Sequence, residues 1–168
     1  TWEDAVQAYE MGLAGVVLSN HGGRQLDFAR SGVEVLEEVM RELRKRGSFP
    51  NPAFQVMVDG GFRRGTDILK AIAMGATAVG IGRPFLYAYS AYGVDGVIHA
   101  INLLRDELEM NMRLIGARSI EELVPGMVDL SALHNHTGAV FPKQDQSVLD
   151  FMDKSRLLSL IHISEPTR

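Results

Sequence analysis

The chain carries a candidate base and a candidate carboxylate ligand in one short stretch, Ser19–Arg24, with the sequence SNHGGR. His21 stands three residues before Arg24. A neutral imidazole takes up a proton near pH 7, and a guanidinium binds a carboxylate through two parallel hydrogen bonds. A lone histidine is more often structural and a lone arginine a surface charge, but their pairing in a glycine-rich loop favours function. The stretch predicts a site that removes a proton from a carboxylate-bearing substrate.

Two further stretches, rich in glycine and each with an arginine, predict a phosphate site. Residues 59–63 have the sequence DGGFR, and residues 80–84 have the sequence GIGRP. Glycine lets backbone N–H groups approach an anion closely, and the guanidinium groups of Arg63 and Arg83 match phosphate geometry. Either stretch alone could be an ordinary turn. Because both follow expected strands and both contain an arginine, phosphate binding is the stronger interpretation.

The elements that must position these stretches alternate between strand and helix. Short apolar runs predict strands at residues 15–19, 54–58 and 78–81, the first of them buried on both faces. Apolar spacing predicts helices after an N-cap at Thr1, at 33–46, after an N-cap at Thr66, at 84–89 and at 92–115. This order is typical of a parallel α/β unit, whose strands end on a common face. The three polar stretches are therefore expected to converge.

Composition excludes several classes of function. The 168-residue chain is 46% apolar and 23% charged, as a globular domain is. Its net charge of −4 offers no basic surface for nucleic acid, and no apolar run approaches the roughly 18 residues of a membrane span. The absence of cysteine excludes disulfides and cysteine-ligated zinc. His134 and His136 have no third ligand beside them, so we predict no metal site.

Three motifs carry a family resemblance that covers about residues 1–137. Residues 18–27 (LSNHGGRQLD), 58–67 (VDGGFRRGTD) and 80–85 (GIGRPF) resemble the FMN-dependent 2-hydroxy acid dehydrogenase and oxidase family, which includes flavocytochrome b2 and glycolate oxidase. The first motif is highly specific, whereas other FMN barrels share the phosphate motifs. Residues 103–116 look most like the fungal flavocytochrome b2 branch.

The resemblance implies the C-terminal half of a TIM (β/α)₈ barrel. Three strands cannot close a barrel, which needs about 250 residues, and an open doubly wound sheet is the structural alternative. We expect the barrel portion at residues 1–137 and a loosely ordered extension at 138–157. Residues 158–168 resemble the translation of a sequencing adapter, and we expect them to carry no function.

The resemblance also implies a role for each motif residue. His21 is the expected catalytic base and also contacts the substrate, and Arg24 binds the substrate carboxylate. The residues expected to bind FMN are Ser19, Asp59, Gly60, Gly61, Arg63, Gly82 and Arg83. The implied reaction oxidises a small L-2-hydroxy acid, such as lactate or glycolate, to the 2-oxo acid.

Further expectations follow from individual branches of the family. The electron acceptor is oxygen in an oxidase and cytochrome c in a dehydrogenase, the latter with a haem in an upstream domain. A flavocytochrome b2-like protein is expected in mitochondria and a glycolate oxidase-like protein in peroxisomes. Family resemblance implies a homo-oligomer, a tetramer, with no nucleic-acid or membrane partner.

Two alternatives stay open at this stage. One is another FMN barrel, such as a type 2 isopentenyl-diphosphate isomerase, against which the His21–Arg24 pair argues. The other is a non-catalytic half-barrel that binds a phosphorylated ligand. The family's flavin-side Lys, its Asp partner for the base and its substrate-binding Tyr residues would all precede Thr1. We therefore expect this chain alone neither to bind FMN tightly nor to turn over.

Overall fold

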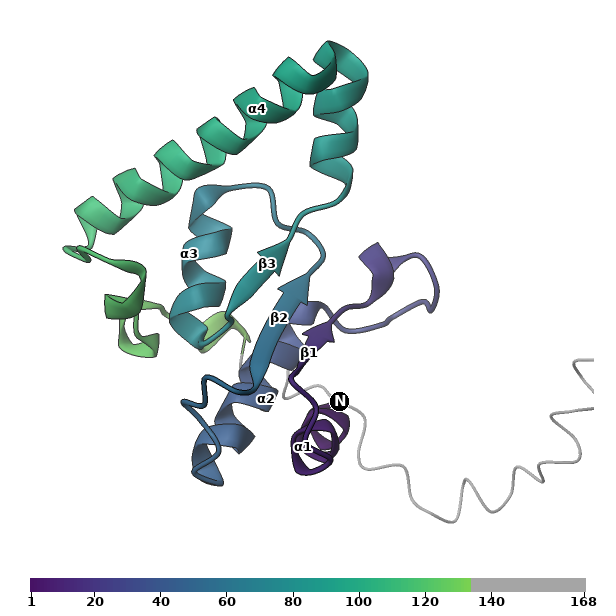
Figure 1. The fold of residues 1–168 in the computed structure, drawn as a ribbon, viewed down its shortest axis with the longest axis vertical. Helices are drawn as coiled ribbons and strands as arrows, with labels where there is room; N and C mark the ends of the chain where they lie inside the picture. Colours follow the sequence, from purple (N-terminus) through teal and green to yellow (C-terminus); the bar gives the residue numbers. More distant parts are fainter. Residues whose placement is uncertain (134–168) are drawn as a thin grey trace, which may run out of the picture. The chain divides into compact units, whose positions relative to one another are not determined.

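The structure is a computed structural model that describes residues 1–133, of which Thr1–Ser131 form one compact unit. The predicted extension at 138–157, the adapter-like end and the pair His134 and His136 lie outside the described residues. Figure 1 shows the elements of the unit. In chain order they are α1 (Trp2–Glu10), β1 (Gly15–Leu18), η1 (His21–Gly23), α2 (Gly32–Lys45), β2 (Gln55–Asp59), α3 (Gly65–Met74), β3 (Ala78–Gly80), α4 (Arg83–Leu114), η2 (Ile120–Glu122) and η3 (Pro125–Met127).

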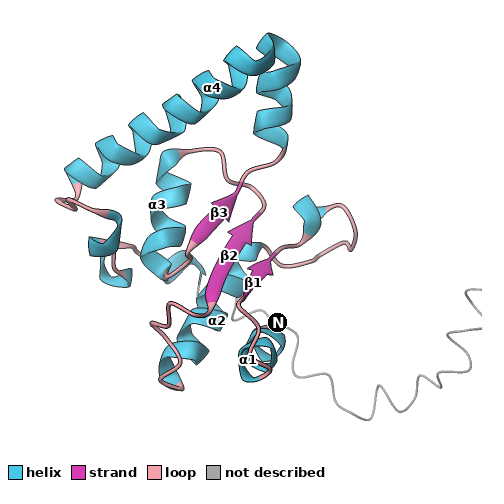
Figure 2. Cartoon of the chain, viewed as in Figure 1, coloured by secondary structure: helices cyan, strands magenta, loops and turns pink. Residues whose placement is uncertain are grey.

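The three strands form a parallel sheet in the order β1-β2-β3, which confirms the predicted α/β alternation. Val16 pairs with Val56, and Val58 pairs with Val79. Each strand lies within one residue of its predicted range. The arrows in Figure 2 run in one direction, so the loops that follow the strands leave the sheet from the same edge.

The helix starts follow the capping pattern of the sequence, with one correction. At α1, the Thr1 hydroxyl accepts a hydrogen bond from the backbone N–H of Asp4, and the Asp4 carboxylate accepts one from the amino nitrogen of Thr1, as in a capping box. Thr66, the predicted N-cap of α3, lies inside that helix, which begins at Gly65. The Asp67 carboxylate instead accepts from the N–H groups of the two residues before the helix.

The core lies between the sheet and the two helices that cover it, α2 and α3. Val56 and Val58 of β2 point to this side and are fully buried. The buried apolar residues that the helices contribute are Leu36, Val39, Met40 and Leu43 from α2 and Leu69, Ala71, Ala73 and Met74 from α3. α4 packs across α3, where Met112 joins Leu69 and Ala73 in a second cluster.

The other face of the sheet is open, which corrects the expectation that β1 is buried on both faces. Val17 is 61% exposed and Met57 is 36% exposed, whereas Val58 next to it is buried. Apolar side chains on both faces are typical of closed parallel barrels, in which the inner ones fill the barrel interior. The apolar pattern of β1 therefore matches the closed barrel, although the described residues cover only one face.

α4 consists of two segments that meet at Gly93, where φ is 61° and ψ is −145°. The sequence predicted a short helix near Pro84 and a separate long helix, and Figure 1 shows them joined through a bend. The bend carries the long segment back across α3. No helix within residues 1–133 has the length and apolar character that a membrane crossing needs.

Candidate functional site

Three loops meet at the C-terminal edge of the sheet. We call residues 19–31 the first loop, residues 60–64 the second loop, and residues 81–82 the third loop, which leads into Arg83 of α4. Nη2 of Arg83 donates a hydrogen bond to the carbonyl oxygen of Gly22 at 2.8 Å. A Cβ atom at Gly60 would lie only 3.3 Å from Oδ1 of Asn20. The structure thus brings the three polar stretches together.

The first loop opens with a left-handed turn that begins at His21. His21, Gly22 and Gly23 have φ angles of 54°, 66° and 70°. The N–H of Gly23 closes the turn by donating to the carbonyl oxygen of Asn20 at 3.1 Å and to its Oδ1 at 3.0 Å. Glycine adopts such angles freely, whereas a histidine is strained by about 1 kcal/mol. Backbone strain of this kind is concentrated at functional positions.

The side chains of His21 and Arg24 are exposed, one turn apart. Nδ1 of His21 lies 3.0 Å from the side-chain amide of Gln25, and the backbone N–H of His21 donates to the Ser19 hydroxyl at 3.0 Å. Within the described residues, the Arg24 guanidinium has no hydrogen-bond or ion-pair partner. Both groups are therefore accessible to a small substrate. Gln25 was not predicted as a site residue, although it lies in the motif at residues 18–27 and one turn after His21.

The second loop forms an open cradle beyond Asp59. Gly60 and Gly61 have φ angles of 90° and 85°, and a Cβ atom at Gly61 would meet no atom within 4 Å. Oδ1 of Asp59 is buried and has no hydrogen-bond partner among the described residues. A buried carboxylate oxygen without a donor is costly, so this atom suits a ligand that presents a hydroxyl or N–H group.

The third loop adds the start of a helix to this cradle. Gly82 is the N-cap of α4 and Pro84 lies in its first turn; a Cβ atom at Gly82 would meet nothing within 4 Å. The first turn of a helix leaves backbone N–H groups unpaired and carries partial positive charge. The exposed guanidinium of Arg63 lies in the adjacent loop, without a partner in residues 1–133. Together these groups suit a phosphate.

Two acidic residues that the sequence analysis did not assign to the site hold the second loop. Asp67 accepts from the backbone N–H groups of Arg63 and Arg64, each at 3.0 Å. Glu107 of α4 accepts from the Arg64 guanidinium and, at 2.7 Å, from the N–H of Gly65. The Arg64 guanidinium and the Gly65 N–H hold the pKa of the Glu107 carboxyl below its ordinary value. Asp67 had a sequence signal as a capping residue, whereas Glu107 is 42 residues from Gly65 and had none.

The arrangement can bind an anion at one end and exchange a proton at the other. Gly61, Gly82, Arg63 and the start of α4 form the anion side, and His21 with Arg24 forms the proton-transfer side. Within residues 1–133, no three histidine or acidic side chains are placed to hold a metal ion. The residue types on the two sides suit acid–base chemistry beside a phosphate cradle.

Known proteins are similar to this chain in sequence. The model of a family described as FMN-dependent dehydrogenase matches residues 1–130. The L-lactate dehydrogenase (cytochrome) of Wickerhamomyces anomalus is 59% identical over 133 residues, which are 79% of this chain and 23% of that protein. Glycolate oxidase 2 of Oryza sativa subsp. indica is 47% identical over 128 residues, which are 76% of this chain and 33% of that protein. The chain spans about a quarter to a third of the length of these relatives.

A solved structure shares the fold. The flavin-binding domain of baker's yeast flavocytochrome b2 matches with a TM-score of 0.76 and 49% identity, over 99% of this chain and 38% of that one. The three-stranded unit is accordingly part of a (β/α)₈ barrel, as predicted. Since the family model spans all three loops and nearly the whole described unit, the chain belongs to the FMN-dependent dehydrogenase family.

Proposed function

We propose that this chain acts within a longer FMN-dependent enzyme that oxidises a small L-2-hydroxy acid to the 2-oxo acid. One observation carries the proposal: the turn that holds His21 and Arg24 lies beside the anion cradle and is tied to it by Arg83. A base and a carboxylate ligand are thereby set next to a place for a phosphorylated cofactor. Residues 1–137 are the proposed barrel portion.

The residues of the cradle fit FMN. The buried, unpartnered Oδ1 of Asp59 suits a ribityl hydroxyl, and the space beside Gly61 and Gly82 admits a phosphate. We assign Asp59, Gly60, Gly61 and Arg63 to the ribityl-phosphate region, Gly82 and Arg83 to the phosphate, and Ser19 to the flavin ring. Bound FMN supplies the two-electron acceptor of the reaction. Arg83 uses only Nη2 on the Gly22 carbonyl, which leaves its other N–H groups for the phosphate.

The other residues act on the substrate. Arg24 binds the substrate carboxylate through its forked N–H groups and so orients the 2-hydroxyl group toward His21. His21 takes up a proton from the substrate on Nε2, which requires that its own proton sit on Nδ1. In the structure the amide nitrogen of Gln25 faces Nδ1 of His21 and donates to it; the amide turned over, with its oxygen facing the ring, accepts from Nδ1–H and stabilises the tautomer that the base needs.

The names of the relatives support a 2-hydroxy acid as the substrate. They leave two candidates for the electron acceptor, a cytochrome and oxygen. A cytochrome appears in the name of the Wickerhamomyces relative, whereas an Arabidopsis thaliana relative that is 48% identical is named a peroxisomal (S)-2-hydroxyacid oxidase. The higher identity to the former favours a cytochrome acceptor, and with it a haem domain elsewhere in the longer protein. We also propose a homotetramer, on family resemblance.

The decisive experiment replaces the base without disturbing its turn. Asparagine tolerates a positive φ, so His21→Asn keeps the backbone of the turn while it removes the imidazole. In the longer, FMN-loaded protein, we expect the anaerobic rate of flavin reduction by L-lactate or glycolate to fall by about 10²–10⁴-fold. An unchanged thermal midpoint would show that the fold is intact.

Two results would contradict the proposal. A variant that is reduced as fast as the parent would remove His21 from the role of base. A parent protein that binds FMN but is reduced by neither hydroxy acid would point to an FMN barrel of different chemistry.

A further inference from the structure

The second loop is attached to α4 through a single carboxylate. Oε1 of Glu107 accepts from the Arg64 guanidinium, with Nε at 2.7 Å and Nη2 as a second donor. Oε2 of the same residue accepts from the backbone N–H of Gly65 at 2.7 Å. Both carboxylate oxygens are thus used, one on each side of the junction between the second loop and α3.

The backbones of α3 and α4 approach each other closely at the same place. A Cβ atom at Gly65 would lie 2.5 Å from the backbone nitrogen of Leu108 and 2.9 Å from the carbonyl oxygen of Leu104. Gly65 is therefore the point where α3 rests on the α4 backbone. The Glu107 carboxylate lies directly beside this contact, so it can fix the start of α3 and the loop that precedes it.

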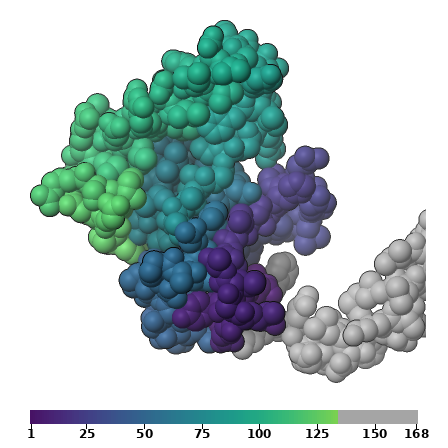
Figure 3. Space-filling view, in the orientation of Figure 1, coloured from purple at the N-terminus to yellow at the C-terminus, as the bar shows by residue number. Residues whose placement is uncertain are grey.

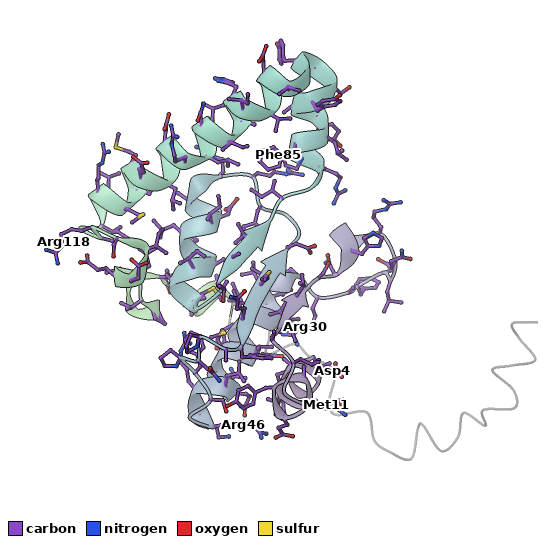
Figure 4. The ribbon with its side chains drawn as sticks, in the orientation of Figure 1. Asp4, Met11, Arg30, Arg46, Phe85 and Arg118 are labelled. Carbon is purple, nitrogen blue, oxygen red and sulfur yellow. The ribbon has the colours of Figure 1, made fainter. Side chains whose placement is uncertain are left out.

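Apolar packing anchors the middle of the second loop, where Phe62 is 3% exposed. The side chains of Arg63 and Arg64 instead line a cavity of about 450 Å³, together with Phe85, Leu104 and Glu107. Phe85 is labelled near the start of α4 in Figure 4. Because a cavity supplies few dispersion contacts, the hydrogen bonds of Glu107 hold the Arg64 end of the loop against α4.

We propose that Glu107 is a positioning residue that fixes the second loop, through Arg64 and Gly65, in the form that receives the phosphate of FMN. The inference rests on the proposed function and deepens it. It also gives different roles to the adjacent residues Arg63 and Arg64. Arg64 is paired with Glu107, whereas Arg63 has no partner among residues 1–133 and stays available to the phosphate.

The test compares FMN with riboflavin, which lacks the phosphate. The dissociation constant of each is measured by flavin fluorescence in the longer protein and in its Glu107→Gln variant. We expect Glu107→Gln to weaken FMN binding roughly tenfold and riboflavin binding by less than about twofold. A purely structural role for Glu107 would weaken both ligands alike. The control is Glu109→Gln, two residues along the same helix, where Glu109 pairs only with the surface residues Arg105 and Arg113 among the described residues.

Each outcome has a distinct meaning. If the parent does not prefer FMN to riboflavin, the proposed phosphate site fails, and the role of Glu107 fails with it. If the parent prefers FMN and Glu107→Gln keeps that preference in full, the positioning role alone is overturned. If Glu107→Gln does not fold, Arg64→Lys takes its place, because it keeps the charge but loses the fork. Arg64→Lys is expected to lower the FMN preference, and an unchanged preference would overturn the proposal.

Discussion

The first and second loops of this site differ in length and in exposure. The second loop has five residues and is fixed at its end by the carboxylates of Asp67 and Glu107. The first loop has 13 residues, since it runs from 19 to 31, and projects from the body of the unit in Figure 3. Between residues 19 and 29 its hydrogen bonds are mostly internal, and Phe28 is 91% exposed.

Two arginines attach the first loop to the rest of the unit. Arg83 reaches the carbonyl oxygen of Gly22, and Arg30, labelled in Figure 4, pairs with Glu38 of α2 at 2.9 and 2.8 Å. The contrast corresponds to the proposed roles. The short loop is the one assigned to the cofactor, and the longer, exposed loop is the one assigned to the substrate.

The largest expected difference comes from changing one glycine to alanine at two places: Gly65, which follows the second loop, and Gly23 in the first loop. Gly65→Ala drives a methyl group into the α4 backbone and is expected to lower the free energy of unfolding by about 2–3 kcal/mol. Gly23→Ala meets nothing within 4 Å and bears only the cost of its positive φ, about 1 kcal/mol. Urea unfolding measures both. Equal losses would show that the start of α3, beside the second loop, is no more tightly packed than the turn of the first loop.

A smaller effect is expected from the contact that ties the loops together. Arg83→Gln removes the donor to the Gly22 carbonyl, so the first loop should open more often. Loss of one such hydrogen bond predicts that amide hydrogen exchange within residues 19–31 becomes roughly three- to tenfold faster in the FMN-free protein. Exchange in the second loop, which Asp67 and Glu107 hold independently, should be unchanged. A uniform increase across both loops would mean that they open as one unit.

The fold of the described unit was largely predictable because its signals are local. Apolar runs placed each strand within one residue, and the Thr1–Asp4 capping box fixed the start of α1. The start of α3 was misplaced because Thr66 and Asp67 are both of the types that cap helices. Only the structure shows that the Asp67 carboxylate is the one that accepts from the N–H groups before the helix. The open face of β1 was also missed, since an apolar Val17 has the same sequence signature whether or not a partner covers it.

In the candidate site, too, the residues with a local sequence signal could be predicted and the others could not. His21, Arg24 and the phosphate-cradle residues were identified by type, by spacing and by their place after a strand. Gln25 and Glu107 were not, because a supporting role depends on which side chain the fold brings near. Glu107 is separated from Gly65 by 42 residues and by the bend at Gly93. Periodicity in the sequence of α4 marks its apolar face, but cannot indicate which exposed carboxylate reaches another loop.

The smallest expected effect concerns pH and again separates the two loops. The Glu107 pKa lies below its ordinary value because the Arg64 guanidinium and the Gly65 N–H stabilise the charged carboxylate. Its stabilising contribution is therefore complete above the ordinary glutamate pKa and is lost as the pH falls through the lowered folded value. The gap in thermal midpoint between the parent and Glu107→Gln should shrink as the pH falls from about 5 to about 3. His21→Asn removes no carboxylate, so its gap to the parent should show no such convergence over that range. A Glu107→Gln gap that stays constant down to about pH 3 would mean that the carboxylate acts by its shape and not by its charge.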